Sequence, residues 1–306
     1  MSVKTRFFII SDTHGKALDL KEGLQADVAI HCGNLTDKST IDEFCTTLHL
    51  LRRIPAPLKL VIAGNHDLTL DEPAFEKAAD YLDPLLVNQV YGPVGQSRRL
   101  LERAIVYASP FTPSQGGWAY NGGWAYGYPR GEKHDFAIGK DVDVVITHGP
   151  PHGIMDYTHG RERAGCHHLF GAVARARPML HCFGHIHEGW GSRLVTWRDK
   201  ISEHPWHFED IDHTRSVLID KLSNLIPTQF DEPDMVEEKA RRRSECAQRG
   251  YCSTSHCSTD ASPLRPNKQT LFINASIEGS NDVLKSQPPF LIDIELPATN
   301  RHTATG

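Results

Sequence analysis

Short apolar runs, separated by helix-like segments and followed by polar turns, constrain the fold of this sequence more than any other feature. Each run is short and contains β-branched or aromatic residues, as buried strands do. Two intervening segments, residues 42–54 and 166–176, carry apolar residues three and four positions apart, which is typical of amphipathic helices. This alternation predicts a layered α/β fold with functional residues at the carboxyl ends of its strands. The expected strands are residues 7–10, 27–32, 58–64, 104–109, 143–149, 180–185, 270–276 and 289–296.

The segment before the last two of these strands differs from the rest of the chain. Residues 199–268 lack a long apolar run, and residues 231–250 read as an exposed helix with glutamate–arginine pairs four positions apart. We therefore expect a single domain over residues 1–306. Its core would lie in residues 5–198 and 270–297, with a polar insertion at residues 199–268.

The cysteines do not favour a disulfide framework, because they are seven, an odd number, and four of them are scattered through the first 182 residues. Cys246, Cys252, His256 and Cys257 lie close together, but their spacing matches no standard zinc pattern. We expect the cysteines of this stretch to be free surface thiols.

The composition limits the classes of partner. A formal net charge of -5 argues against a large non-specific nucleic-acid surface. No stretch approaches the roughly 20 apolar residues of a membrane span, and the apolar segment at the N-terminus is too short for a secretory signal. We therefore expect a cytoplasmic protein without a membrane segment. The oligomeric state is not indicated.

Residues 111–131 are rich in glycine and aromatic residues, and the pattern Gly-Gly-Trp-Ala-Tyr at residues 116–120 returns at residues 122–126. A surface loop packed by its own aromatic side chains is the simpler interpretation. An aromatic rim near a functional site is the alternative.

Residues of the types that bind metals gather where the expected strands end. Asp12 and His14 follow the first strand two positions apart, so their side chains project the same way. Each such motif alone is weak evidence, but five clusters are hard to explain as histidines buried in a core. The other candidate ligands are Asn34, Asn65 with His66 beside it, His148, and the pair His185 and His187.

The types of ligand narrow the choice of metal. Imidazole with carboxylate and amide oxygen, and without thiolate, suits Mn, Fe, Zn or Ni better than Ca or Mg. The candidates are too many for one tetrahedral ion and enough for two. A centre of two ions about 3.5–4 Å apart activates water and binds both oxygens of a phosphoryl displacement.

The ordered motifs D-x-H, GN-x-x-D, GNHD, THGPP and GHIH resemble those of the metallophosphoesterase, or calcineurin-like phosphoesterase, superfamily. The phrases THGPPHG and FGHIHEGWG and the glycine-rich loop are more similar still to the small metallophosphoesterase-domain-containing proteins. The resemblance covers about residues 5–194 and 270–297. It implies a four-layer α/β/β/α sandwich of two facing mixed sheets, two metal ions at the strand ends, and small phosphoesters or nucleotides as substrates.

The resemblance also implies a role for the positions of each motif. It assigns three residues to a first metal and three to a second: Asp12, His14 and His187, then Asn65, His148 and His185. His66 would be the general acid for the leaving oxygen, and Asp37 would orient its ring.

Asn34 departs from the pattern of this family, which places a metal-bridging aspartate at its position. A Gly-Asn pair after a strand is commonly only a turn, but the surrounding motifs make Asn34 a position of the metal site. A carboxamide is neutral and offers one good oxygen. We therefore expect weak binding of the second metal and attenuated activity.

Three hypotheses about function stay open. The first is a dinuclear-metal-dependent phosphoesterase, most simply a phosphodiesterase acting on nucleotides or related phosphoesters. The second is a non-catalytic or regulatory protein that binds phosphate or nucleotides through a degenerate metal site. The third treats Asn34 as an engineered inactivating change in an active enzyme, which the sequence does not separate from the second.

Overall fold

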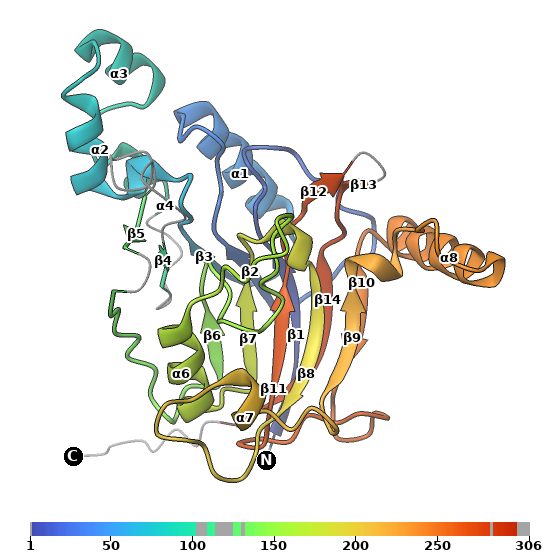
Figure 1. The fold of residues 1–306 in the computed structure, drawn as a ribbon. Helices are drawn as coiled ribbons and strands as arrows, with labels where there is room; N and C mark the ends of the chain where they lie inside the picture. The colour runs from blue at the N-terminus through green and yellow to red at the C-terminus, as the bar shows by residue number, and fades with distance from the viewer. Residues whose placement is uncertain (1, 102–108, 114–124, 130–131, 282–283, 299–306) are drawn as a thin grey trace, which may run out of the picture.

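Two five-stranded sheets dominate the computed structural model, which describes residues 2–101, 109–113, 125–129, 132–281 and 284–298 (Figure 1). In spatial order, the first sheet contains β10 (Cys252–Ser255), β14 (Phe290–Pro297), β1 (Ser2–Ile10), β2 (Val28–Cys32) and β3 (Leu58–Ile62). The second sheet contains β6 (Val144–Ile146), β7 (Leu180–Phe183), β11 (Gln269–Asn274), β8 (Gly191–Thr196) and β9 (Val217–Lys221). Strands β1, β2 and β3 run parallel in the first sheet, and β6, β7 and β11 run parallel in the second.

Alternate side chains of β1 enter two different layers of the molecule. Phe7 and Ile9 lie in a core between the two sheets, which they share with residues of β11 and β7. Phe8 and Ile10 point to the other face, where they pack in one cluster with residues of α1 (Ile41–Arg53). This is the two-residue period of a strand buried on both faces.

The outer face of the second sheet is covered by α6 (His167–Ala176). Phe170 and Val173 of this helix pack in one cluster with Phe272 of β11 and Phe183 of β7. The layers are therefore α1, the first sheet, the second sheet and α6. The expected four-layer α/β/β/α sandwich is confirmed (Figure 1).

The remaining elements lie at the edges and ends of the sandwich. The helices are α2 (Glu72–Ala79), α3 (Pro84–Val90), α4 (Gln96–Leu101), α7 (His207–Asp210) and α8 (Pro233–Arg249), with short turns at Leu68–Leu70, His187–Gly189 and Leu222–Asn224. Two short strand pairs are β4 (Thr112–Pro113) with β5 (Gly127–Tyr128) and β12 (Glu278–Asn281) with β13 (Leu284–Ser286). Most of the expected strand at 104–109 and of the aromatic segment at 111–131 lies outside the described residues.

The expectation that residues 199–268 form an insertion outside the core is wrong. Strand β9 extends the second sheet beside β8, and β10 extends the first sheet beside β14. Leu225 and Leu264 are buried in the core between the sheets. These strands escape prediction because each is short, lies at a sheet edge and carries few buried apolar side chains.

The expectation of free surface thiols is also wrong. Cys246 near the end of α8 forms a disulfide with Cys252 in β10, and both residues are buried. Gly250, with a left-handed φ of 80°, ends the helix and turns the chain so that the two cysteines meet. Cys257 is free but buried.

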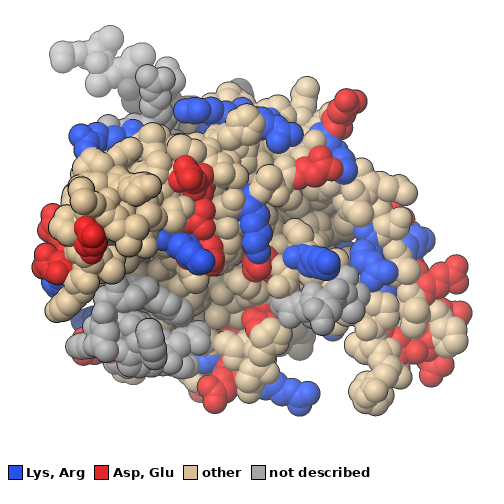
Figure 2. All heavy atoms as spheres, turned by 90° about the horizontal axis from the view of Figure 1, so that it is seen from above, with Lys and Arg blue, Asp and Glu red and all other residues tan. Residues whose placement is uncertain are grey.

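The surface carries charges of both signs. Figure 2 shows lysine and arginine side chains interspersed with aspartate and glutamate over the face seen from above. In this view the described residues present no continuous basic surface of the kind that binds nucleic acid non-specifically. Within the described ranges, no helix is both long and apolar enough to cross a membrane.

Leu225→Ala is expected to lower the free energy of unfolding by about 2–5 kcal/mol, because it removes a fully buried side chain from the core between the sheets. Leu218→Ala, at a half-exposed position of β9, is the matched control and is expected to cost less than about 1 kcal/mol. Urea denaturation of both variants measures the difference. Small and equal effects would place residues 199–268 outside the core after all.

Candidate metal centre

Loops from both sheets meet at the carboxyl ends of β1, β2, β3, β6 and β7. The backbone N–H of His185, after β7, donates to Asp12 Oδ2, after β1, at 3.0 Å. The ring of His148, after β6, contacts the backbone oxygen of Cys32, at the end of β2, at 2.8 Å. Polar contacts therefore join the two sheets at this edge, and every sequence-predicted ligand lies in one of these loops.

Two glycines allow this close approach. A Cβ atom on Gly64 would overlap the backbone nitrogen and the side chain of Asn34, and one on Gly184 would overlap the carboxylate of Asp12. Both glycines come directly before a predicted ligand. The Gly-Asn and Gly-His pairs of the sequence therefore reflect the close packing of loops as well as turn geometry.

Four of the predicted ligands have left-handed backbone conformations, with φ of 56° at Asp12, 47° at His14, 54° at Asn34 and 66° at His185. Residues other than glycine adopt positive φ uncommonly, and such strain gathers at functional sites. Asn34 is therefore a turn residue, as a Gly-Asn pair commonly is, whose side chain also contacts Asp12.

Asp12, His14 and His187 form the first group of candidate ligands, with one ligand atom of each within 4.8 Å of the others. Asp12 is fully buried, and its Oδ1 lies 3.6 Å from His187 Nε2. His14 is also buried, and its Nε2 has no hydrogen-bond partner among the described residues. A buried imidazole nitrogen without a partner, beside a carboxylate, is a position that a cation satisfies.

The electrostatics of the first group suit a cation. Burial raises the pKa of Asp12, but its contact with His187 and the neighbouring imidazoles outweigh burial and hold that pKa well below its usual range. Burial lowers the pKa of His14. Burial also acts to lower the pKa of His187, but the contact with Asp12 leaves this pKa above its ordinary value. Asp12 is therefore ionised and His14 neutral at pH 7, as metal ligands must be.

Asn65, His148 and His185 form the second group. His148 Nδ1 lies 2.8 Å from a backbone oxygen, which only accepts, so this nitrogen carries the proton. The unprotonated Nε2 of His148 lies 2.8 Å from Asn65 Oδ1, so a lone pair faces an amide oxygen. His185 Nδ1 lies 2.9 Å from the same oxygen. Burial lowers the pKa of His148 to about 4 and that of His185 to about 3, so both rings are neutral at pH 7.

Both groups fit divalent metals. A cation between His148 Nε2 and Asn65 Oδ1 would replace a repulsion between lone pairs with two coordinate bonds. Imidazole, carboxylate and amide oxygen together suit Mn, Fe, Zn or Ni. The second group is the set that the sequence resemblance implies, and its role as a ligand set stays a prediction. Among the described residues, His14, Asp37 and His66 also bring one possible ligand atom each within 4.8 Å of one another.

Asn34 joins Asp12 of the first group to the loop after β3 through its amide. The residue is 2% exposed, its Nδ2 donates to Asp12 Oδ1 at 2.9 Å, and its Oδ1 accepts from the backbone N–H of His66 at 3.0 Å. Asn34 therefore uses a donor that an aspartate lacks. Its amide holds Asp12 to the loop after β3 through hydrogen bonds that need no metal.

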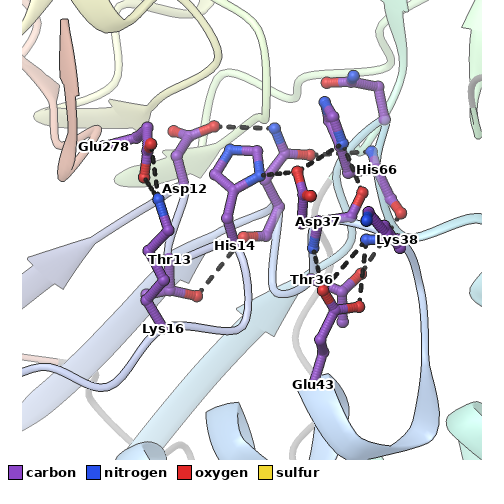
Figure 3. Close-up of polar contacts among 12 residues, drawn as sticks. Asp12, Thr13, His14, Lys16, Thr36, Asp37, Lys38, Glu43, His66 and Glu278 are labelled. Carbon is purple, nitrogen blue, oxygen red and sulfur yellow. Dashed lines mark hydrogen bonds and ion pairs between the residues drawn. The ribbon is translucent and has the colours of Figure 1, made fainter.

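His66 lies beside the first group, with its ring centre 4.8 Å from that of His14 (Figure 3). His66 Nδ1 lies 2.8 Å from the backbone oxygen of Asp37, so Nδ1 carries the proton. The Asp37 carboxylate is farther away, at 3.8 Å from His66 Nδ1 and 3.4 Å from His14 Nδ1. The closest contact between Asp37 and the His66 ring is therefore made by the main chain of Asp37 and not by its carboxylate.

Asp67, the last residue of the motif GNHD, was not predicted to have a role, yet its carboxylate joins two loops of the site. It is fully buried and accepts the backbone N–H groups of Leu35, Thr36 and Gly64 at 2.8–3.1 Å. Burial raises the pKa of Asp67 to about 6. Its place after a Gly-Asn turn is the signal in the sequence, because aspartate side chains commonly accept hydrogen bonds from turn backbone.

Two further histidines support the ligand loops and were not predicted. His31 Nε2 lies 2.9 Å from Thr13 Oγ1, and His181 Nε2 lies 2.9 Å from Thr147 Oγ1. Each threonine is next to a candidate ligand in the sequence. Burial lowers the pKa of both histidines to about 3, so they act as neutral hydrogen-bond partners.

Comparison with known proteins relates the chain to a family. The family model described as calcineurin-like phosphoesterase matches residues 5–189, more than half of the chain. Metallophosphoesterase domain-containing protein 1 of Homo sapiens is 36% identical over 211 residues, which cover 61% of this chain and 62% of that protein. Probable rhamnogalacturonate lyase C of Emericella nidulans is 34% identical over 206 residues, which cover 63% of this chain and 18% of that protein. The chain thus spans about three-fifths of the human relative.

Asn34→Asp is expected to destabilise the metal-free protein and to increase its stabilisation by metal. The new carboxylate would lie against the buried Asp12 carboxylate, at the 2.9 Å contact that the amide nitrogen now makes, and like charges repel. We expect the Tm in EDTA to fall by about 5 °C or more. Mn²⁺ is expected to raise the Tm more in this variant than in the unchanged protein.

Asn34→Ala is the control for this prediction, because it removes the same amide hydrogen bonds without adding a charge. It should destabilise the metal-free protein less than Asn34→Asp does. If Mn²⁺ raises the Tm of the unchanged protein and that of Asn34→Asp by the same amount, Asn34 lies outside the metal centre.

The stability of the metal-free protein is expected to fall as the pH drops below about 6.5. Burial gives six of the described histidines, namely His31, His148, His152, His181, His185 and His207, pKa values of about 3 or 4, against an ordinary value of 6.5. The folded state takes up these protons less readily than the unfolded state. Its stability is therefore full above pH 6.5 and is lost toward pH 4, by up to about 1.4 kcal/mol per pH unit for each histidine.

Urea denaturation between pH 7 and 4 measures this slope. His181→Gln keeps a hydrogen-bond donor for Thr147. It should lower the slope of unfolding free energy against pH by the contribution of one histidine. An equal slope in the variant and the unchanged protein would contradict the buried neutral state of His181.

Proposed function

Because this chain belongs to the calcineurin-like phosphoesterase family, we propose that it is a dinuclear-metal-dependent phosphodiesterase that acts on nucleotides or related small phosphoesters. The observation that carries the proposal is the pair of ligand groups beside His66 at one edge of the sandwich. Asn65, His66 and His187 line one cleft of about 320 Å³. This volume suits a small phosphoester.

The first group would hold one divalent ion, and the second group would hold the other. Mn, Fe, Zn and Ni are the candidates that match the ligand types. When bound, the ions supply positive charge to the phosphate oxygens and acidity to the attacking water.

His66 would donate a proton to the leaving oxygen. The Asp37 carbonyl fixes a proton on His66 Nδ1, so Nε2 is the nitrogen that exchanges a proton with the substrate. The His66 side chain is 34% exposed and lines the cleft, so a substrate can reach it. Asp37 acts here as a positioning residue, and it does so through its main chain.

Asn34 would attenuate the activity. With an amide at this position, Asp12 is the one carboxylate among the residues of both ligand groups and Asn34. We expect the second ion to bind weakly for this reason, because two divalent ions would face a single negative charge from these ligands.

A phosphate-binding protein without catalysis is the second candidate, and one observation favours it. The Asn34 amide satisfies both the Asp12 carboxylate and the His66 backbone N–H without a metal. The cleft therefore keeps its shape in the metal-free protein. Equal phosphate binding in EDTA and in Mn²⁺, without turnover, would favour this candidate.

Hydrolysis of bis(4-nitrophenyl) phosphate at saturating Mn²⁺, with metal content measured on the same sample, tests the proposed function. We expect turnover that EDTA abolishes and Mn²⁺ restores. Bound metal without turnover of this diester or of a dinucleotide would overturn the proposal.

His66→Ala is expected to lower turnover of a dinucleotide by about 10²–10⁴-fold while metal content stays unchanged, because the alkoxide leaving group needs a proton. The effect should shrink for bis(4-nitrophenyl) phosphate, since nitrophenolate leaves without one. Asp37→Ala is the control and should cost much less, because the contacting carbonyl remains. Loss of metal in His66→Ala would show that His66 is a ligand instead.

A further inference from the structure

The cleft that contains His66 is also lined by Thr158, His159 and Gly160. These residues form the tip of a hairpin, residues 157–163, in the segment that follows β6. None of them belongs to either ligand group. The proposed function therefore leaves this part of the cleft wall without a role.

The hairpin is held closed by its own hydrogen bonds. Tyr157 pairs with Arg163 in an antiparallel bridge, and the backbone N–H of Thr158 donates to the backbone oxygen of Glu162 at 3.0 Å. The backbone N–H of Arg161 donates to Thr158 at 2.9 Å, and Arg161 has a left-handed φ of 57°. The tip is therefore a tight turn with a defined shape.

Asp156 anchors this hairpin to the body of the protein. Its buried carboxylate accepts from Arg163 Nη1 at 2.5 Å and from the backbone N–H groups of Gly153 and Gly165 at 2.9 and 3.3 Å. The Arg163 guanidinium also lies 4.1 Å from the centre of the Tyr157 ring, a cation–π contact. Removing Arg163 would leave the buried Asp156 carboxylate without its cation, which is costly. The hairpin is therefore held in place.

A single carboxylate joins the tip to the first group. Glu188, the residue after His187, accepts the backbone N–H of His159 at 3.2 Å, and the same oxygen lies 2.9 Å from His159 Nε2. The His159 side chain is 73% exposed and Glu188 is 23% exposed. The imidazole is therefore held at one nitrogen, and it lines the cleft with most of its surface exposed.

We propose that this hairpin tip binds the ester group of the substrate and that His159 is a specificity-determining residue. The proposal rests on the proposed function, in which the two ligand groups and His66 act on the phosphate. The rest of the substrate then extends along the remaining lining of the cleft, which includes Thr158, His159 and Gly160.

The chemistry of the tip selects a class of substrate. A cleft of about 320 Å³ is at the small end for ligand sites and accommodates a phosphate with one ring-sized group. The His159 imidazole offers a flat face for stacking. A Cβ atom on Gly160 would meet only Thr158 Oγ1, at 3.6 Å, so the space beside this glycine is open. Phosphoesters that carry a planar ring are therefore preferred to those that carry a methyl group.

Isothermal titration of the Mn²⁺-loaded protein with phenylphosphonate and methylphosphonate, which are not hydrolysed, tests this preference. His159→Ala is expected to weaken the binding of phenylphosphonate about five- to tenfold and that of methylphosphonate less than about twofold. Metal content and Tm should stay unchanged. With bis(4-nitrophenyl) phosphate, KM should rise by the same factor at constant kcat. Glu162→Ala, exposed on the same hairpin and absent from the cleft lining, is the matched control and should change neither affinity.

Two failures of this experiment are distinguishable. Equal losses for both phosphonates in His159→Ala, or no loss, would overturn the role of His159, and turnover by the unchanged protein would leave the proposed function standing. An unchanged protein that binds neither phosphonate and hydrolyses no diester would overturn the proposed function, and the role of the hairpin with it.

Discussion

A buried carboxylate at the junction of the two sheets is the constraint on which the rest of the site depends. Asp12 is fully buried, and an unpaired charge in such a position is costly. Its oxygens contact the Asn34 amide, the backbone N–H of His185 and the ring of His187, which come from two other loops. Those loops must converge on Asp12, and left-handed backbone at Asn34 and His185 accompanies the convergence.

Much of this geometry is held by contacts within the protein rather than by a ligand. Asp67 joins the loops after β2 and β3, and the His148 ring joins the second sheet to Cys32 of the first. The hairpin tip is held in the same manner by Asp156 and Glu188. Groups that are in place before a substrate arrives need no reorganisation during the reaction. The cleft is therefore preorganised on both the ligand side and the hairpin side.

The sandwich could be predicted where strands are apolar on both faces, as in β1, because that pattern is a property of the strand itself. The edge strands β9 and β10 could not, since their places depend on a neighbouring strand more than on their own side chains. The candidate ligands could be predicted from their positions at strand ends. For Asp67, the sequence carries the signal of a turn but not the contacts with Leu35 and Thr36, which form only on folding. The contacts of Asp156 with Arg163 and Gly165 likewise depend on the folded hairpin. The Cys246–Cys252 bond likewise depends on the turn at Gly250.

Compared with an aspartate at the same position, Asn34 changes the charge of the site more than it changes the shape of the site. Its amide keeps Asp12 in place. In the two proposed ligand sets, Asp12 is then the one carboxylate beside imidazoles and amides. Two divalent ions would carry positive charge that these ligands do not neutralise, and an anionic phosphate would bring the missing negative charge. Because such coupling is reciprocal, phosphate and the second ion would each strengthen the binding of the other by the same factor. An aspartate at position 34 would supply part of that charge from the protein and weaken the coupling. On the proposed function, the amide would therefore make occupancy by the second ion depend on the substrate.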